Sequence, residues 1–421
     1  MQETKSLGRA WAVCMIGALY FFYIFLQMMK FNAIGSDLMM DFHIGSTGLG
    51  ALSSAYFWGN IVFLFVAGLM LDRFSTKKIL AVVMWVVILC TFVFAFLKNQ
   101  HTSFFAFFLI GIAGAFGLLI PLRLASRWFP SDKMALVSGL IVTIGFFGAM
   151  TSQSPLVWLV NQVGWRHAMI WDAGFGVLLF FLMMFVIQDF PEGVTNKMSR
   201  EQATSWSFLW YSIKQAVINR QNWSFGLYTC LLNLPLFVFA TFGLLYLQQV
   251  QHLSETQAAF MVVILYFGAM LGSPALGWIS DKMQNRKMPM IVSGLISLAL
   301  ILGIMYWNNM SIATIYTLFF LLGFFTSAQV ITYPVIAESN AEEIVGSGFG
   351  MGSTLIMSGG AILVPLFGWL LDLHWGGQVV HDIPIHTLAE YRFALWLLPI
   401  SFIVGILAVM IGKETHGKRI V

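Results

Sequence analysis

The sequence predicts an all-α membrane protein with twelve transmembrane helices in two pseudo-symmetric six-helix bundles. Three observations support this fold class. Only 10% of the 421 residues are charged and 59% are hydrophobic, whereas a soluble domain carries about 25% charged residues. Apolar stretches of about 20 residues, long enough to cross a hydrocarbon core, recur along the whole chain. Finally, a short charged motif occurs once in each half of the chain with the same internal spacing.

Twelve apolar stretches are predicted to span the membrane, and one long polar stretch divides them into six and six. The polar stretch, 188–222, is the predicted cytoplasmic linker between an N-terminal bundle, 1–187, and a C-terminal bundle, 223–421. Span one contains Gly, and span eleven contains Gly and Pro, and membrane helices tolerate both residues when neighbouring groups satisfy the backbone. The predicted spans are 10–35, 46–71, 79–97, 103–128, 134–160, 166–187, 223–248, 255–279, 289–307, 311–337, 344–371 and 389–412.

The linker contains a helical pattern of its own. Trp206, Trp210, Ile213 and Val217 recur at helical spacing. The pattern is typical of a helix lying in the membrane interface, and a plain soluble linker helix explains it equally well.

The basic residues predict the orientation of the chain. Most of the 22 Lys and Arg residues fall in loops on the side of the two termini, and only Lys98, Arg166 and Arg392 fall in loops on the other side. Because Lys and Arg accumulate in cytoplasmic loops, we expect both termini in the cytoplasm. The three cysteines lie inside apolar stretches at unrelated spacings, so we expect neither a disulfide framework nor a metal site, and no cofactor.

The charged motif is part of an internal repeat. Gly68, Asp72, Arg73, Lys77 and Lys78 recur 209 residues later (277 minus 68) as Gly277, Asp281, Lys282, Arg286 and Lys287. His43, Thr47 and Gly59 recur at the same offset as His252, Thr256 and Gly268. A solvated cytoplasmic turn would explain either charge cluster alone, but not the constant register. The repeat predicts two related halves, parallel to each other because six is an even number of crossings.

These residues resemble the loop motif of the major facilitator superfamily, found between helices two and three and again between eight and nine. Ser75 stands where the family usually has Gly. The resemblance implies a secondary carrier that works by alternating access, and not an enzyme. It also implies a gate, in which the glycines let helices approach closely and the aspartates take a cation or a helix N-terminus. The predicted gate residues are Gly68, Asp72, Arg73, Arg127, Gly277, Asp281 and Lys282, with Glu338 either in the gate or on the surface.

A finer resemblance rests on four stretches. "FFYIFLQMM" (Phe21–Met29), "DLMMDFHIGSTGLGALSSAYF" (Asp37–Phe57), "SRWFP" (Ser126–Pro130) and "GWR" (Gly164–Arg166) are similar to the phagosomal nutrient transporter group of intracellular bacteria. That group is similar to lysosomal dipeptide carriers. The resemblance implies a multi-pass protein of the bacterial inner membrane that takes up an amino acid, a short peptide or a related carboxylate. Transport of a carboxylate siderophore or a nucleoside, and export of small organic compounds, stay open as alternatives.

Two other classes of membrane protein are disfavoured. A receptor or sensor without transport would not need gate motifs in both halves, and the chain has no Walker sequence for a primary pump. The expected partners are a small-molecule substrate and the lipid bilayer, with a co-transported proton as an open question. We expect no nucleic acid partner, and a monomer.

In this architecture the substrate site lies near the membrane midplane between the halves. Ionisable residues inside spans are costly unless they are paired or hydrated, so they are the candidates for function. Tyr20, Tyr23, Gln27 and Lys30 share one face of the first span. We expect this face to line a cavity, although the long side chain of Lys30 could instead reach the outer interface.

Arg123 and Asp172 complete the charged candidates. Arg123 in span four could bind a substrate carboxylate bidentately or tie to the gate through Asp72, and both interpretations stay open. Asp172 is the only carboxylate well inside a span. It could pair with Lys30, and it is the candidate for proton coupling. If it pairs with Lys30, Arg123 leaves the cavity net positive and selective for a carboxylate. The second half offers uncharged candidates, namely Tyr228, Asn233, Tyr246, Gln329 and Tyr333, with Tyr266 and Thr326 nearby in sequence.

Overall fold

The computed structural model describes residues 2–129, 134–191, 206–307, 310–341, 344–380 and 383–419. Within them, eleven helices are long and apolar enough to cross a membrane. The one further predicted span, 46–71, forms the 28-residue helix α3. The predicted all-α membrane fold is therefore confirmed.

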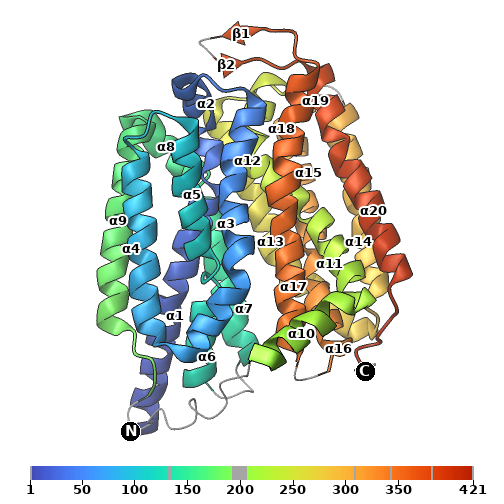
Figure 1. Cartoon of the computed structure of the whole chain (residues 1–421). Coiled ribbons are helices and arrows are strands. Elements are labelled where there is room, and N and C mark those ends of the chain that lie inside the picture. The colour runs from blue at the N-terminus through green and yellow to red at the C-terminus, as the bar shows by residue number, and fades with distance from the viewer. Residues whose placement is uncertain are drawn as a thin grey trace. The chain divides into compact units, whose positions relative to one another are not determined.

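The elements follow the predicted spans, several of which are divided into two or three helical pieces (Figure 1). In chain order they are α1 (Gln2–Met29), α2 (Phe31–Phe42), α3 (Ser46–Arg73), α4 (Thr76–Phe94), α5 (Gln100–Gly114), α6 (Leu119–Trp128), α7 (Met134–Thr151), α8 (Ser154–Val163), α9 (Trp165–Val186), α10 (Trp206–Ile218), α11 (Arg220–Leu232), α12 (Leu234–Gln249), α13 (Glu255–Met283), α14 (Lys287–Tyr306), α15 (Ile312–Thr326), the 3₁₀-helix η2 (Ser327–Ile331), α16 (Thr332–Glu338), α17 (Val345–Ser358), the π-helix η4 (Gly359–Leu363), α18 (Val364–Leu373), β1 (Val379–Val380), β2 (Ile383–Pro384), α19 (Leu388–Leu395) and α20 (Leu397–Ile411).

Residue contacts divide the chain into two compact units. Unit 1 comprises Met1–Lys30 and Ala55–Ala203, and unit 2 comprises Phe31–Ser54 and Thr204–Val421. The units differ from the predicted bundles mainly at 31–54, because α2 and the first turns of α3 group with the C-terminal half of the chain. Within unit 2, the side-chain Oδ1 of Asn32 accepts a hydrogen bond of 2.7 Å from the backbone N–H of Leu244 in α12.

The internal repeat is visible in the backbone. His43 has a φ angle of 52° and His252 one of 53°, and positive φ is uncommon for residues other than glycine. Helices α3 and α13 begin three residues after these two positions, at Ser46 and Glu255. The predicted offset of 209 residues thus holds for a rare backbone conformation as well as for residue identity.

The same helix pair is in close contact in each unit. In unit 1, a Cβ atom on Gly59 of α3 would lie 2.0 Å from the carbonyl oxygen of Phe108 in α5. In unit 2, a Cβ atom on Gly268 of α13 would lie 2.1 Å from the carbonyl oxygen of Phe320 in α15. These distances leave no room for a side chain, so the helix backbones themselves are in contact, as is typical of small residues in membrane bundles.

Helix α9 shows how a span divides its two faces. One face is buried and carries the only charged residue of the helix interior. The opposite face is exposed and carries large apolar side chains, which suits contact with lipid acyl chains. The buried face includes Asp172, Gly176, Leu179 and Met183, and the exposed face includes Trp171, Phe175, Leu178 and Phe185.

The predicted interruption of span eleven and the predicted linker helix are both present. Span eleven changes from α- to π-helix at η4, which contains two glycines, and π-helical segments are rare insertions within α-helices. Helix α10 occupies the second part of the linker and leaves Trp210 and Val217 exposed while it buries Ser212 and Ala216. The side chain of Trp206 lies outside the described part of the structure.

Candidate functional site

Four polar side chains inside unit 1 form one buried network around Gln27 of α1. The Nε2 of Gln27 donates to Asp172 Oδ2 at 2.7 Å. Its Oε1 accepts hydrogen bonds from Lys30 Nζ at 2.5 Å and from the Thr91 hydroxyl at 3.0 Å. Lys30 Nζ lies 3.6 Å from Asp172 Oδ2. The network therefore joins α1 to α4 and α9.

Lys30 is fully buried, so the alternative in which it reaches the outer interface is wrong, and its predicted pairing with Asp172 is present. Its Nζ also lies 5.7 Å from the ring centroid of Phe94 and 5.1 Å from that of Phe107. A buried ammonium group is costly unless it is paired and hydrogen-bonded. The carboxylate, the amide and the two ring faces together supply this compensation.

One carboxylate oxygen of Asp172 does not take part in the network. Oδ1 is buried and has no hydrogen-bond partner among the described residues. A carboxylate oxygen in this position forgoes hydration without replacement. The geometry thus allows Asp172 to take up a proton at Oδ1 while Oδ2 keeps its bond to Gln27.

The two tyrosines of the same face of α1 also point into unit 1. The hydroxyl of Tyr20 donates to the carbonyl of Ala113 at 2.7 Å, and that of Tyr23 donates to the carbonyl of Asp172 at 3.1 Å. Both side chains are fully buried. The face predicted from sequence is therefore one polar stripe, and its role in lining a substrate cavity stays a prediction.

Helix α6 carries the two arginines of span four. Arg123 is half-buried. One turn later, Arg127 Nη1 donates to the hydroxyl of Thr76 at 2.9 Å and lies 4.0 Å from Asp189 Oδ1. Arg127 thus ties α6 to the start of α4, which fits its predicted gate role. The side chains of Asp72 and Arg73 lie outside the described residues, so the tie between Arg123 and Asp72 stays untested.

In unit 2 the structure brings Asn233 and Gln329 together. Gln329 Nε2 of η2 donates to Asn233 Oδ1, between α11 and α12, at 2.6 Å. Tyr333 follows one turn after Gln329, and its ring lies 5.7 Å from that of Phe349. Gln329 and Tyr333 are both partly exposed, and their contact with a solute stays a prediction.

The other tyrosines of the second half make their contacts elsewhere. The hydroxyl of Tyr228 donates to the carbonyl of Met290 at 2.7 Å, and that of Tyr246 donates to the carbonyl of Ile304 at 3.3 Å. Tyr266 likewise donates to the carbonyl of Leu236 at 2.9 Å. All three are buried, so in this conformation they act in packing. Their proposed contact with substrate stays a prediction.

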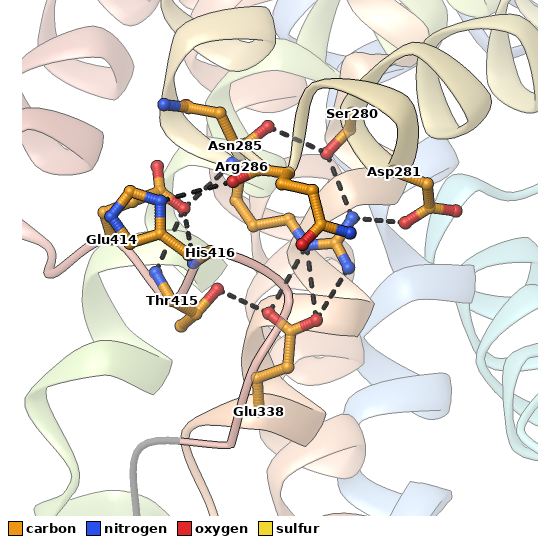
Figure 2. A network of polar contacts seen from close by, with 9 residues as sticks. Ser280, Asp281, Asn285, Arg286, Glu338, Glu414, Thr415 and His416 are labelled. Carbon is orange, nitrogen blue, oxygen red and sulfur yellow. Dashed lines mark hydrogen bonds and ion pairs between the residues drawn. The ribbon is translucent and has the colours of Figure 1, made fainter.

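A second polar network surrounds Arg286, in the repeated motif of unit 2 (Figure 2). Arg286 Nη1 donates to Asp281 Oδ1 at 2.5 Å, and Nη2 donates to Glu338 Oε1 at 2.7 Å. Glu414 accepts the backbone N–H groups of Arg286 and Lys287, at 2.9 and 2.8 Å. The network links α13, the start of α14, α16 and the segment that follows α20.

The electrostatics of Glu414 follow from these contacts. Partial burial raises the pKa of Glu414, but backbone N–H groups, first those of Arg286 and Lys287, bring it below the ordinary value. A carboxylate at the N-terminus of α14 also interacts favourably with the helix dipole. The charged form of Glu414 is therefore the form that fits this network.

The sequence predicted only part of this network. Asp281 takes a cation, as expected, and the cation is Arg286. The Nζ of Lys282 instead lies 4.9 Å from the ring centroid of Trp278. Glu414 was missed. Its counterpart in unit 1 is Asp189, which follows α9 and accepts the backbone N–H of Lys77 at 2.8 Å, and this parallel between the ends of the two halves was the available signal.

The close helix approach expected at the glycines of the motif is not seen among the described residues. A Cβ atom on Gly68 or on Gly277 would have no described atom within 4 Å. Within the described residues, no other helix therefore lies close to these two glycines. The close approach occurs instead at Gly59 and Gly268, at their own repeated positions.

A doubled bundle of membrane-spanning helices, with polar networks buried inside a unit and charged networks at the repeated motifs, defines a membrane transporter of the repeat type. The chain belongs to the Major Facilitator Superfamily, whose family model matches residues 16–365 and 237–419. It is therefore a transporter and not an enzyme.

Comparison with known proteins gives relatives of two kinds. The chain is 22% identical to the probable galactarate/D-glucarate transporter GudP of Escherichia coli (strain K12), over 83% of this chain and 84% of that protein. It is 23% identical to a D-galactonate transporter of Escherichia coli O6:H1, over 79% and 82%. It is also 19% identical to the lysosomal dipeptide transporter MFSD1 of Danio rerio, over 81% and 76%.

A solved structure has the same fold. The inward-facing, unoccupied crystal structure of a bacterial homologue of the human lysosomal transporter Spinster superposes with a TM-score of 0.73, at 13% identity, over 96% of this chain and 95% of that one. The identity is low, so this likeness concerns the fold alone.

Proposed function

We propose that this protein carries a small organic acid across the bacterial inner membrane by alternating access, with both termini in the cytoplasm. The observation that carries the proposal is the charge balance inside unit 1. Lys30 and Asp172 form a buried pair, and Arg123 adds a second cation on α6. The formal charges of Lys30, Asp172 and Arg123 sum to +1, which favours an anionic solute.

Arg123 is the residue best suited to hold a carboxylate. It is half-buried on α6. A guanidinium can bind a carboxylate with two parallel hydrogen bonds, and these bonds are stronger where water is scarce. The gate interpretation of Arg123 is the competing one, and the experiment below separates the two.

Two chemical classes of acid are consistent with the relatives. Sugar acids are favoured because the names of several relatives specify galactarate, D-glucarate or D-galactonate. An amino acid or a short peptide is favoured by the resemblance to the phagosomal nutrient transporter group and by the similarity to a dipeptide transporter. Both classes carry a carboxylate beside uncharged hydrogen-bonding groups. Gln329 and Tyr333 remain the candidates in unit 2 for contacts with the uncharged part.

The test is uptake into proteoliposomes with radiolabelled D-glucarate, D-galactonate, a dipeptide and uridine. We expect one of the acids, and not uridine, to be transported. Arg123→Ala should abolish binding of that acid, and Arg123→Lys should keep part of it, because charge is retained and the bidentate geometry is lost. Arg220→Ala is the matched control, since Arg220 is exposed at the start of α11. If Arg123→Ala binds the acid normally and only the rate changes, Arg123 belongs to the gate.

We further propose that Asp172 couples transport to a proton. Two observations support this role. The Oδ1 of Asp172 is buried and has no hydrogen-bond partner in the described structure. Its Oδ2 is connected to Lys30 through hydrogen bonds to the side chain of Gln27. Asp172→Asn should abolish accumulation driven by a pH gradient while substrate exchange across the membrane continues. Accumulation by Asp172→Asn at the parental level would exclude this role.

A further inference from the structure

A carboxylate of α18 is bound at the first turn of α3, at the end of unit 2 that carries the β1–β2 hairpin (Figure 1). Asp372 Oδ1 accepts the backbone N–H of Ser46 at 3.2 Å. Its Oδ2 accepts the backbone N–H and the hydroxyl of Thr47, both at 2.7 Å. The first N–H groups of a helix have no partner within the helix, so a carboxylate here satisfies them and interacts favourably with the helix dipole.

The same two helices are in close contact beside this carboxylate. A Cβ atom on Gly368 of α18 would lie 2.3 Å from the carbonyl oxygen of Ser46, and one on Gly50 of α3 would lie 2.9 Å from the Cα of Pro365. Helix α3 belongs to the first half of the repeat and α18 to the second. In an alternating-access transporter, helices from opposite halves meet at the end that is closed and separate when that end opens.

A buried histidine lies against this contact. His386 is 2% exposed, and its Nε2 lies 2.8 Å from the hydroxyl of Ser46 and 3.8 Å from Asp372 Oδ1. Its Nδ1 has no hydrogen-bond partner among the described residues and lies 3.7 Å from Glu390 Oε2. The backbone N–H of His386 donates to Gln249 Oε1 of α12 at 3.1 Å, which holds the loop in place.

The groups that face His386 come from three sides. Helix α18 contributes Asp372, α19 contributes Glu390 and Tyr391, and α3 contributes the Ser46 hydroxyl.

We propose that Asp372 acts as a latch on the first turn of α3, and that protonation of His386 releases the latch, so that acidic pH favours opening of this end. The proposal rests on the alternating-access transport proposed above, and on the predicted topology this end faces the periplasm.

The direction of the pH effect follows from competition between His386 and α3 for the carboxylate of Asp372. A protonated His386 is a cation 3.8 Å from Asp372 Oδ1, and it draws the carboxylate away from the N–H groups of α3. It is also a charge in a site with little water, and opening removes that cost. Burial lowers the pKa of His386, against the opposing effect of Asp372 and Glu390, so that the net pKa lies below the ordinary value of 6.5. The latched state therefore binds fewer protons than the open state, and acid favours the open one.

The experiment measures opening directly and needs no substrate. A single cysteine is placed at Ser53, which is 2% exposed two turns into α3, in a chain whose three native cysteines are replaced. Its initial rate of labelling by a membrane-impermeant maleimide is measured at pH 7.5 and pH 5.5. Each rate is divided by that of Gln378→Cys, which is exposed in the same end, because this ratio removes the pH dependence of the thiol reaction itself.

We expect Asp372→Asn to raise the normalised rate at pH 7.5 by about fivefold or more, the factor that corresponds to about 1 kcal/mol for a lost helix cap. Thr47→Val, which removes one donor to Asp372, should raise it less and serves if Asp372→Asn does not fold. The parent should label about twofold faster or more at pH 5.5 than at pH 7.5. His386→Gln should lose this pH response, whereas His374→Gln, on the same loop and exposed, should keep it.

Two outcomes would overturn the inference. Unchanged labelling in both Asp372→Asn and Thr47→Val would show that Asp372 does not hold this end closed. A pH response that is absent in the parent, reversed, or preserved in His386→Gln would show that His386 does not release the latch. Loss of the Arg123-dependent uptake would leave these labelling results unaffected, so the two proposals fail separately.

Discussion

Lys30 is held inside an apolar bundle by contacts with residues from several different helices. Its partners come from α1, α4, α5 and α9, and they include a carboxylate, an amide and two aromatic rings. The three-and-four spacing of Tyr20, Tyr23, Gln27 and Lys30 was enough to predict a shared face. The spacing could not show that the face is closed off by other helices, because that depends on how α9 packs.

The buried pair should matter for stability. Lys30→Met leaves Asp172 buried without its cation, which should lower the free energy of unfolding by about 3–5 kcal/mol. The double variant Lys30→Met with Asp172→Leu should recover most of this loss. Thermal unfolding of the purified protein in detergent measures both, with Lys98→Met, at an exposed site, as the control. Equal losses in the single and double variants would mean that the pair contributes through packing alone.

At the scale of the element, composition predicted the membrane spans but not which face of each span is buried. Beyond its first turn, helix α9 is apolar on all sides except at Asp172, and its exposed stripe of Trp171, Phe175 and Leu178 looks the same in sequence as a core stripe. The twelve spans were predictable because length and hydropathy are local properties. Apart from the interruption of span eleven, the division of several spans into shorter pieces was not predictable, because helix breaks depend on how neighbouring helices pack.

The glycine contacts of α13 lead to a prediction at this scale. Gly268→Val places a side chain where the backbone of α15 already lies, so the two helices must separate and the yield of folded, monodisperse protein should fall sharply. Gly277→Val in the same helix has open space around it and is the matched control. The measurement is size-exclusion chromatography with thermal unfolding. Comparable behaviour of the two variants would contradict the tight helix contact.

Glu414 gives a prediction that depends on pH. Because its pKa in the folded protein is lowered, its charge stabilises the start of α14 fully above the ordinary carboxyl pKa of 4.5, and this contribution is lost as the pH falls below that value. Glu414→Gln should therefore lower the unfolding temperature at pH 7, and the difference from the parent should shrink toward pH 4. A difference that is constant over this range would show that the charge has no part in it.

At the scale of the whole molecule, the repeat is the strongest prediction that sequence alone supported. It appeared as an offset between two charged motifs, and the structure repeats it in the left-handed residues His43 and His252. The substrate site stays a prediction. Asn233 and Gln329 meet, as do Lys30 and Asp172, but Tyr228 and Tyr246 hydrogen-bond to backbone carbonyls. A polar residue in a span can serve packing or binding, and its sequence position does not distinguish the two.

The repeat and the distribution of basic residues together predict the side of the membrane for each motif. Lys78→Cys and Lys282→Cys, both at exposed positions, should react with an impermeant maleimide only after the cytoplasmic side is made accessible. Lys98→Cys, also exposed, should react from the opposite side. Whole cells compared with inverted vesicles give this measurement. Labelling of Lys78→Cys and Lys282→Cys from opposite sides would contradict the parallel repeat.

The position of Glu414 has a consequence for how the protein is made. Asp281, Arg286 and Glu338 are synthesised early enough to meet while the ribosome is still adding α17 to α20, whereas Glu414 and Thr415 are added only after α20 is complete. Until then the backbone N–H groups at the start of α14 lack their carboxylate partner. The contact between Glu414 and the start of α14 can therefore form only after α20 has been synthesised, later than the contacts of Arg286 with Asp281 and Glu338.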